Sequence, residues 1–172
     1  MSKNHPPLPH DEAKTIEQAI QKIRFDKVEN IYIFKNGKQI RRFKGDSNKV
    51  SIDENHLFEL ENSSIIHNHP SGSSFSIEDV KAITKFKAKE LILVTHNHIY
   101  TLKRPPLGWN INFDNENIIN NINTYYNLAS DEMDKMISKN EISPLERDKE
   151  IFHYIWSLFF QQYEIDYKKT AL

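Results

Sequence analysis

The chain has 172 residues, enough for one domain with a modest appendage and too few for a second large domain. Its net charge of -1 gives no basic footprint for binding nucleic acid or an anionic membrane surface. The chain contains no cysteine, which excludes disulfides, thiolate zinc sites and cysteine nucleophiles. Any metal ion must therefore be held by His, Asp or Glu.

The N-terminal segment is polar and rich in proline. Residues 1–10 are predicted to form a flexible tail, because they cannot bury enough apolar surface to offset the entropy lost on ordering. The segment lacks the apolar core of a signal peptide, and no apolar run of about 18 residues follows it. We therefore expect a cytoplasmic protein that does not cross a membrane.

The first two thirds of the chain alternate strand and helix patterns. A helix is predicted over residues 11–24, where apolar residues recur on one face. Strands over residues 29–34 and 39–44 flank Asn36-Gly37, a dipeptide typical of tight hairpins. Three further segments are predicted: a short strand over 49–52, a helical turn over 57–60 and a buried central strand over 62–69.

A second α/β segment follows the central strand. Residues 76–89 have the apolar spacing of an amphipathic helix, and residues 90–95 form an apolar run typical of a central strand. A strand over 99–103 is expected to pair back across a turn, and Trp109 is expected to hold the next loop. This alternation predicts an α/β fold.

The remainder of the chain is predicted to be helical. One helix begins at Asp114 and carries an apolar stripe to about residue 139. Ser143-Pro-Leu-Glu is a capping box with proline at the first helical position, and it begins a second helix. The aromatic face of this helix is too large to be left in water, so it is expected to pack on the preceding helix or on a second chain. The predicted division is a domain over residues 11–110 and a C-terminal helical extension over residues 111–172.

The stretch over residues 65–79 concentrates the side chains that can bind a metal ion. His67 and His69 are two residues apart at the end of the predicted central strand, so both imidazoles point to one side. A helix beginning at Ser76 carries Asp79 in its first turn, from which the carboxylate can fold back towards the histidines. Two imidazoles and one carboxylate leave a tetrahedral Zn²⁺ with an open position for water, the arrangement of a catalytic zinc site.

This pattern resembles a known family. His67-x-His69 followed by Ser76-x-x-Asp79 resembles the JAMM (MPN+/JAB) zinc metallopeptidases, and its wording is similar to the RadC-like, phage-associated JAB-like branch. The resemblance covers about residues 28–104. It implies a mixed sheet flanked by helices. It also implies roles for five residues: His67, His69 and Asp79 as zinc ligands, Glu29 as general base, and Ser76 as a hydrogen-bonding partner of the transition state.

One feature departs from the family pattern. The segment between His69 and Ser76 is one residue shorter than usual. Gly72 tolerates dihedral angles that other residues avoid, so the loop is expected to absorb the difference before the helix begins. The shorter loop is expected to narrow the substrate groove.

Other interpretations of the same residues remain open. Ser76 and Asp79 also form an ordinary capping box, a role compatible with metal binding. Glu29 is either the base or a plain carboxylate at a strand edge. If Glu29 is not the base, the candidates are Glu54, Glu59 and Glu61. A second His-Asn-His sequence, His96 to His98, has no carboxylate nearby in sequence and is interpreted as structural.

Two functions from different classes follow. The first is zinc-dependent hydrolysis of a peptide or isopeptide bond by a zinc-activated water, and the resemblance adds ubiquitin-like conjugates as a substrate class. The second is a non-catalytic MPN/RadC-like zinc-binding module, for which the resemblance adds a phage origin as one option. It would use the C-terminal helices to bind a partner protein or to form a homodimer. The charge balance disfavours a nucleic-acid partner.

Overall fold

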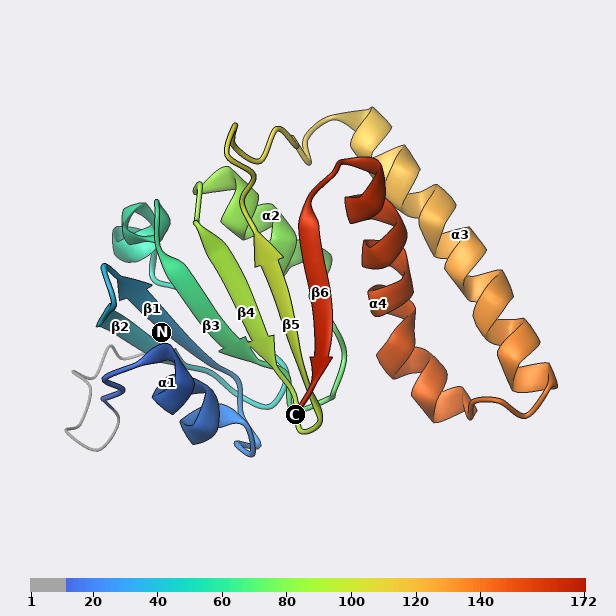
Figure 1. Ribbon diagram of the computed structural model, residues 1–172, viewed down its shortest axis with the longest axis horizontal. Coiled ribbons are helices and arrows are strands. Elements are labelled where there is room, and N and C mark those ends of the chain that lie inside the picture. Colours follow the sequence, from blue (N-terminus) through green and yellow to red (C-terminus); the bar gives the residue numbers. More distant parts are fainter. Residues whose placement is uncertain (1–11) are drawn as a thin grey trace.

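The protein is an α/β structure built on one six-stranded mixed sheet, which confirms the predicted fold class (Figure 1). The computed structural model describes residues 12–172, and the predicted tail over residues 1–10 lies outside the described part. The elements in chain order are α1 (Ile16–Ile23), β1 (Asn30–Lys35), β2 (Lys38–Lys44), the 3₁₀-helix η2 (Glu54–Leu60), β3 (Ser64–Asn68), α2 (Ile77–Lys85), β4 (Glu90–Val94), β5 (His98–Lys103), α3 (Glu116–Ser138), α4 (Pro144–Gln162) and β6 (Asp166–Ala171).

The strand order β2-β1-β3-β4-β5-β6 places β3 near the middle of the sheet. Strands β3 and β4 are parallel and are joined by α2, whereas the other neighbouring strands are antiparallel. The β1–β2 hairpin turns at Asn36 and Gly37, which both have positive φ (51° and 75°), as the Asn-Gly sequence predicts. His67 pairs with Ile31 on one side and Leu93 on the other, so it lies on a strand that is fixed from both sides.

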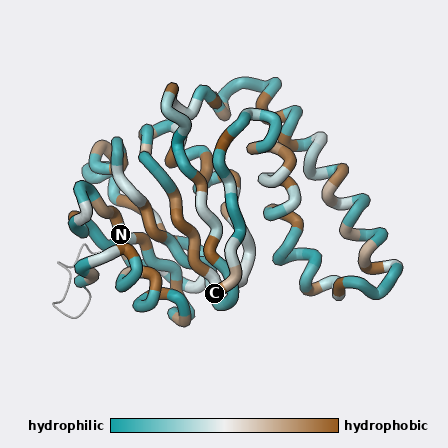
Figure 2. Tube along the Cα trace, in the orientation of Figure 1, coloured by the Kyte–Doolittle hydropathy of each residue, from teal (hydrophilic) through white to brown (hydrophobic). Residues whose placement is uncertain are grey.

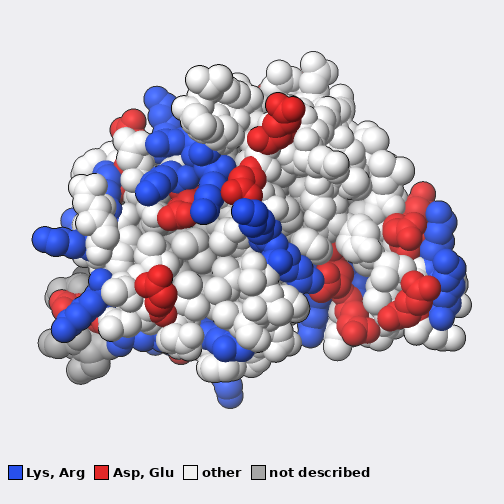
Figure 3. Space-filling model, viewed as in Figure 1, with Lys and Arg blue, Asp and Glu red and all other residues white. Residues whose placement is uncertain are grey.

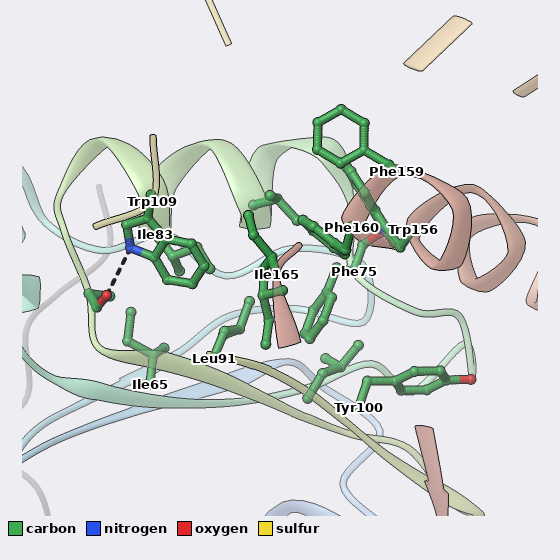
Figure 4. Close-up of a cluster of buried hydrophobic side chains, with 14 of the residues drawn as sticks. Ile65, Phe75, Ile83, Leu91, Tyr100, Trp109, Trp156, Phe159, Phe160 and Ile165 are labelled. Carbon is green, nitrogen blue, oxygen red and sulfur yellow. Dashed lines mark hydrogen bonds between the residues drawn. The ribbon is translucent and has the colours of Figure 1, made fainter. Parts of the chain in front are cut away.

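Helices cover both faces of the sheet. Helix α1 packs on one face through Ile20 and Ile23, against apolar side chains of β1, β3 and β4. Helices α2 and α4 contribute to the larger core on the opposite face, whose aromatic part Figure 4 shows around Phe75 and Trp156. The predicted anchor is confirmed, because the buried Trp109 donates a hydrogen bond from Nε1 to the carbonyl oxygen of Ala88 at 2.9 Å. Figure 2 shows the hydrophobic segments gathered in the central strands.

The C-terminal helices form an antiparallel hairpin beside the sheet (Figure 1). Helix α4 begins at the predicted capping box, with Ser143 as N-cap and Pro144 in the first turn. Helix α3 is uninterrupted, and its N-cap is Asn115 and not Asp114, because the Asn115 side chain accepts the hydrogen bond from the Asn117 amide. The aromatic face of α4 is covered within the chain by α3 and the sheet. Packing on the neighbouring helix is thereby confirmed.

The prediction that the C-terminus is helical throughout is wrong over the last strand. After α4, Glu164 has a positive φ of 55° and the chain turns back to form β6. This strand pairs antiparallel with β5 along its whole length. Its sequence, Asp166–Ala171, has no alternating apolar pattern, so the free edge of β5 decides its conformation.

One predicted strand and one predicted helix end are also wrong. Residues 49–52 form no strand, because the Asp46 carboxylate accepts hydrogen bonds from the amides of Asn48 and Lys49 and closes a turn there. Helix α2 ends at Lys85, four residues before the predicted end. Lys87 has a positive φ of 55° and directs the chain into β4.

Within residues 12–172, no helix combines the length and apolar character that a bilayer crossing requires. The face of the molecule in Figure 3 intersperses Lys and Arg with Asp and Glu.

Candidate metal centre

Two neighbouring strands and the start of a helix bring the predicted residues together. His67 lies within β3, and His69 directly follows Asn68, the last residue of that strand. The amide of His69 still donates to the carbonyl oxygen of Val94 at 3.0 Å, so the parallel pairing with β4 fixes its backbone. The two imidazole rings are 4.7 Å apart, nearly perpendicular, and both are buried. The predicted orientation of both rings to one side is confirmed.

Glu29 directly precedes β1, the other neighbour of β3. Its backbone is fixed by two hydrogen bonds to the chain leaving β2: its amide donates to the Asp46 carbonyl oxygen at 2.7 Å, and its carbonyl oxygen accepts from the Gly45 amide at 2.8 Å. The residue is 8% exposed, and its Oε2 lies 3.2 Å from Nε2 of His67. A carboxylate this deeply buried and directed at an imidazole is not a plain surface carboxylate.

Asp79 reaches the histidines from the first turn of α2. Its Oδ1 lies 3.4 Å from Nδ1 of His67, and its Oδ2 lies 3.3 Å from Nε2 of His69. The capping box is present as well: Oδ2 accepts from the Ser76 amide at 2.8 Å, and Ser76 Oγ accepts from the Asp79 amide at 3.1 Å. The capping box therefore orients the Asp79 carboxylate towards the histidines. The capping role of Ser76 and Asp79 is compatible with metal binding by Asp79.

The loop between His69 and Ser76 contains a tight turn at Gly72. The amide of Gly72 donates to the His69 carbonyl oxygen at 3.1 Å, and Gly72 has a positive φ of 85°. A residue with a Cβ would be strained at this φ, so the unusual dihedral angle expected of Gly72 is confirmed.

The orientation of His69 is set by the same loop. Its Nδ1 lies 3.1 Å and 3.2 Å from the carbonyl oxygens of Ser73 and Ser74, which can only accept hydrogen bonds. Nδ1 therefore carries a proton, and in the neutral ring Nε2 presents its lone pair to the Asp79 carboxylate. A lone pair facing a carboxylate oxygen requires a proton or a cation between them, and a backbone carbonyl at the second nitrogen is characteristic of metal-binding histidines.

The protonation of His67 reflects the two carboxylates around it. Burial alone would lower its pKa, but the hydrogen bonds and charges of Asp79 and Glu29 outweigh burial and raise the pKa to about 9. Burial raises the pKa of Asp79, and the hydrogen bonds from the two histidines more than reverse this, so that its pKa falls well below the usual range. With both histidines neutral, two buried carboxylates would be uncompensated, which a divalent cation corrects.

These residues fit a metal ion. Ligand atoms of Glu29, His67 and His69 all lie within 4.8 Å of one another. Among residues 12–172, these three form the group of at least three His, Asp or Glu residues whose ligand atoms lie this close together. Asp79 adjoins both histidines. Of the three predicted ligands, His67 and His69 belong to this group and Asp79 does not; its third member is Glu29, the predicted base, which lies close enough to act as a ligand.

Sequence reasoning missed Asn68, which lies between the two histidines. Its Oδ1 accepts from the Asn30 amide at 2.6 Å, and its Nδ2 donates to the carbonyl oxygen of Val28 at 2.9 Å. Val28 and Asn30 are the two chain neighbours of Glu29. Asn68 therefore connects the histidine-bearing strand to the backbone that carries the glutamate. The signal available in the sequence was an amide inside a predicted buried strand.

The centre opens into a cleft of about 500 Å³. Besides Glu29, His67, His69 and Asp79, the lining includes Glu78 and five small polar side chains from the turn after β2 and the loop after His69: Ser47, Asn48, Ser71, Ser73 and Ser76. Segment 49–52, which formed no strand, contributes Lys49 and Val50 to the lining.

Glu54, Glu59 and Glu61, the alternative bases, are not among the residues that line this cleft. Glu59 instead forms an ion pair with Arg41 at 2.9 Å, and the carboxylate lies 3.4 Å from His56. Burial raises the pKa of Glu59, and the pairing with Arg41 and His56 lowers it overall. His96 and His98 lie at the β4–β5 turn, outside the cleft.

No known family model, curated protein or solved structure matches this chain.

Proposed function

We propose that the protein is a zinc-dependent hydrolase that cleaves a peptide or isopeptide bond, as the resemblance to JAMM metallopeptidases implies. One observation carries the proposal. Glu29 Oε2 lies 3.2 Å from His67 in the same buried cluster in which His67, His69 and Asp79 converge at the wall of a cleft. A potential base thus lies beside a potential metal site that a substrate can reach.

The donor set favours zinc. Two imidazoles and one carboxylate are the protein ligands of many catalytic zinc sites, and the chain has no thiolate with which to build a structural site. A bound Zn²⁺ supplies a water of lowered pKa and polarises a carbonyl oxygen.

Glu29 is the residue placed to move the proton. Its carboxylate is buried, faces the cluster and contributes to the cleft, so it can accept a proton from a water in the cleft and deliver it to the departing amine. Ser76 Oγ already accepts from the Asp79 amide, so its own hydroxyl proton is left to donate to an oxygen that gains negative charge. These two roles correspond to those expected from the resemblance.

The cleft indicates the general character of the substrate. Its volume falls in the usual range for small-ligand sites, roughly 300–1,000 Å³, and its walls bear mostly short hydroxyl and amide side chains. Such a polar lining suits a polar segment of a protein or peptide. A ubiquitin-like conjugate is one substrate of this kind to be assayed.

The same contact also favours a second candidate, a non-catalytic zinc-binding module. Because ligand atoms of Glu29, His67 and His69 lie within 4.8 Å, Glu29 is close enough to join the two histidines and Asp79 as a fourth ligand. Four protein ligands would close the coordination sphere and leave no position for water. The two candidates thus differ in what Glu29 does.

The substitution Glu29→Gln separates them, because it preserves size and removes the proton acceptor. We expect the zinc content to stay at the wild-type level and hydrolysis of a peptide and isopeptide substrate library to fall by about 10²- to 10⁴-fold. Glu61→Gln, at an exposed residue outside the cleft, is the matched control and should leave both unchanged. Loss of zinc with Glu29→Gln would contradict the role of base and favour the module.

A further inference from the structure

The loop that orients His69 is held from the C-terminal part of the chain. Phe75 follows Ser74, and its carbonyl oxygen accepts a 2.7 Å hydrogen bond from Nε1 of Trp156 in α4. Ser74 is itself buried, and its Oγ lies 2.9 Å from the hydroxyl oxygen of Tyr167 in β6. Both contacts join residues more than 80 positions apart in sequence.

The position of Tyr167 is fixed by its strand and by its ring. Pairing of Tyr167 with Leu102 of β5 sets its place along the sheet. The ring packs 5.9 Å from that of Phe75 and 5.4 Å from that of Phe160, measured between centroids. Figure 4 shows Phe75 and Phe160 in the cluster between the sheet and α4. The packing of the Tyr167 ring therefore fixes the position of its hydroxyl beside Ser74.

The hydrogen-bond chain continues past Tyr167. Nδ1 of His153 lies 2.9 Å from the Tyr167 hydroxyl, so that hydroxyl has one partner on α4 and one on the loop. Burial raises the pKa of Tyr167 far above its ordinary value, which keeps the hydroxyl protonated and able to donate to one partner while accepting from the other.

We propose that Tyr167 is a positioning residue for His69: through Ser74 it holds the two backbone carbonyls that fix the proton on Nδ1 and turn Nε2 towards the metal site. The inference rests on the metal site of the proposed function. It makes β6, a strand with no apolar pattern of its own, a structural part of the centre. The C-terminal segment thereby contributes to metal affinity without supplying a ligand.

The experiment compares hydroxyl deletions in the full-length chain. Tyr167→Phe keeps the packed ring and removes its hydroxyl, and Ser74→Ala removes the same hydrogen bond from the loop side. Tyr163→Phe is the matched control, because its hydroxyl accepts a 2.9 Å bond from Asn121 between α3 and α4, away from the cleft. Zn²⁺ affinity is measured by competition with a chelating dye, the Co²⁺ absorption spectrum reports ligand geometry, and metal-free thermal unfolding reports stability.

Loss of a group bonded directly to a ligand costs about 10- to 100-fold in metal affinity. Tyr167 acts through one more residue, so we expect Tyr167→Phe to weaken Zn²⁺ binding by at least about threefold and to alter the Co²⁺ spectrum. Ser74→Ala should have the same effect, and the double variant should bind no more weakly than either single variant, because the Ser74–Tyr167 hydrogen bond is lost in all three. Tyr163→Phe should lower thermal stability by a similar amount and leave Zn²⁺ affinity and the Co²⁺ spectrum unchanged.

Wild-type Zn²⁺ affinity and an unaltered Co²⁺ spectrum in Tyr167→Phe and Ser74→Ala would overturn the inference and leave the proposed function standing. Equal losses of affinity in Tyr163→Phe would overturn it too, since they would reflect general loosening. A wild-type chain that binds neither Zn²⁺ nor Co²⁺ would overturn both, and that result is distinct from the other two.

Discussion

The chain contains the sequence His-Asn-His twice, and the two copies have different surroundings. The copy at His67 to His69 ends a strand near the middle of the sheet, where both rings are buried against two carboxylates. The copy at His96 to His98 forms the turn between β4 and β5. The His96 ring is exposed and contacts the ring of Phe25, and its backbone carbonyl oxygen accepts from Arg24.

The charges around the two copies differ in the same way. Glu29 and Asp79 overcome the effect of burial and raise the pKa of His67. Burial and the nearby Lys169 lower the pKa of His98. The same His-Asn-His sequence thus lies where positive charge on a histidine is stabilised in the first copy and destabilised in the second. Carboxylates supplied by distant segments, and not the spacing of the histidines, make the difference.

The sharpest test of this comparison removes each pair of histidines in turn. His67→Ala/His69→Ala deletes two ligands, so Zn²⁺ affinity should fall by at least about 10³-fold, more than the 10- to 100-fold cost of losing an outer partner. His96→Ala/His98→Ala should bind Zn²⁺ as the wild type does. Isothermal titration of both variants measures the effect, and a loss in the second variant alone would show that the wrong pair was chosen.

The asparagine in the middle of each copy is expected to contribute differently to the stability of the protein. Asn68→Ala leaves the Asn30 amide without the Asn68 acceptor and removes one of the two hydrogen bonds to the Val28 carbonyl oxygen, so the free energy of unfolding should fall by about 1–3 kcal/mol. Asn97 is exposed in the turn, and Asn97→Ala should change stability by less than about 0.5 kcal/mol. Urea denaturation of the two variants decides the point, and equal losses would show that Asn68 does not connect β3 to the backbone beside Glu29.

The raised pKa of His67 predicts how Zn²⁺ affinity varies with pH. Below about pH 9 this ring is protonated in the metal-free protein, and zinc must displace that proton. Affinity should therefore rise by about tenfold for each pH unit between pH 6 and 8 from this one proton.

Metal-free stability should move the other way. A raised pKa gives a contribution that is complete below the unfolded value of about 6.5 and is lost as the pH rises towards 9. Thermal unfolding with and without zinc over this range tests both directions. Parallel curves would contradict the assigned charges.

Local patterns predicted much of this fold because they act over a few residues. The Asn36-Gly37 hairpin, the capping boxes at Ser76 and Ser143, and the loop anchored by Trp109 all have their causes nearby in sequence or in a single bulky residue. Strand β6 was missed because its conformation comes from pairing with β5 and not from its own residues.

The candidate site divides in the same way. His67, His69 and Asp79 follow a spacing that local geometry can interpret, whereas Glu29 is about 40 residues away and reaches His67 only because β1 pairs with β3. The contacts made by Tyr167 with Ser74 depend on tertiary packing alone and have no counterpart in any short motif.

Long-range ¹H–¹⁵N correlation spectra of ¹⁵N-histidine-labelled protein test whether the first His-Asn-His copy binds the metal ion, because they report protonation and metal binding at each ring nitrogen of the eight histidines. On addition of one equivalent of Zn²⁺, we expect the signals of His67 and His69 to shift, with His69 keeping its proton on Nδ1 and binding through Nε2. Spectra in which those two rings are unaffected by Zn²⁺, or in which His96 and His98 shift instead, would contradict the account.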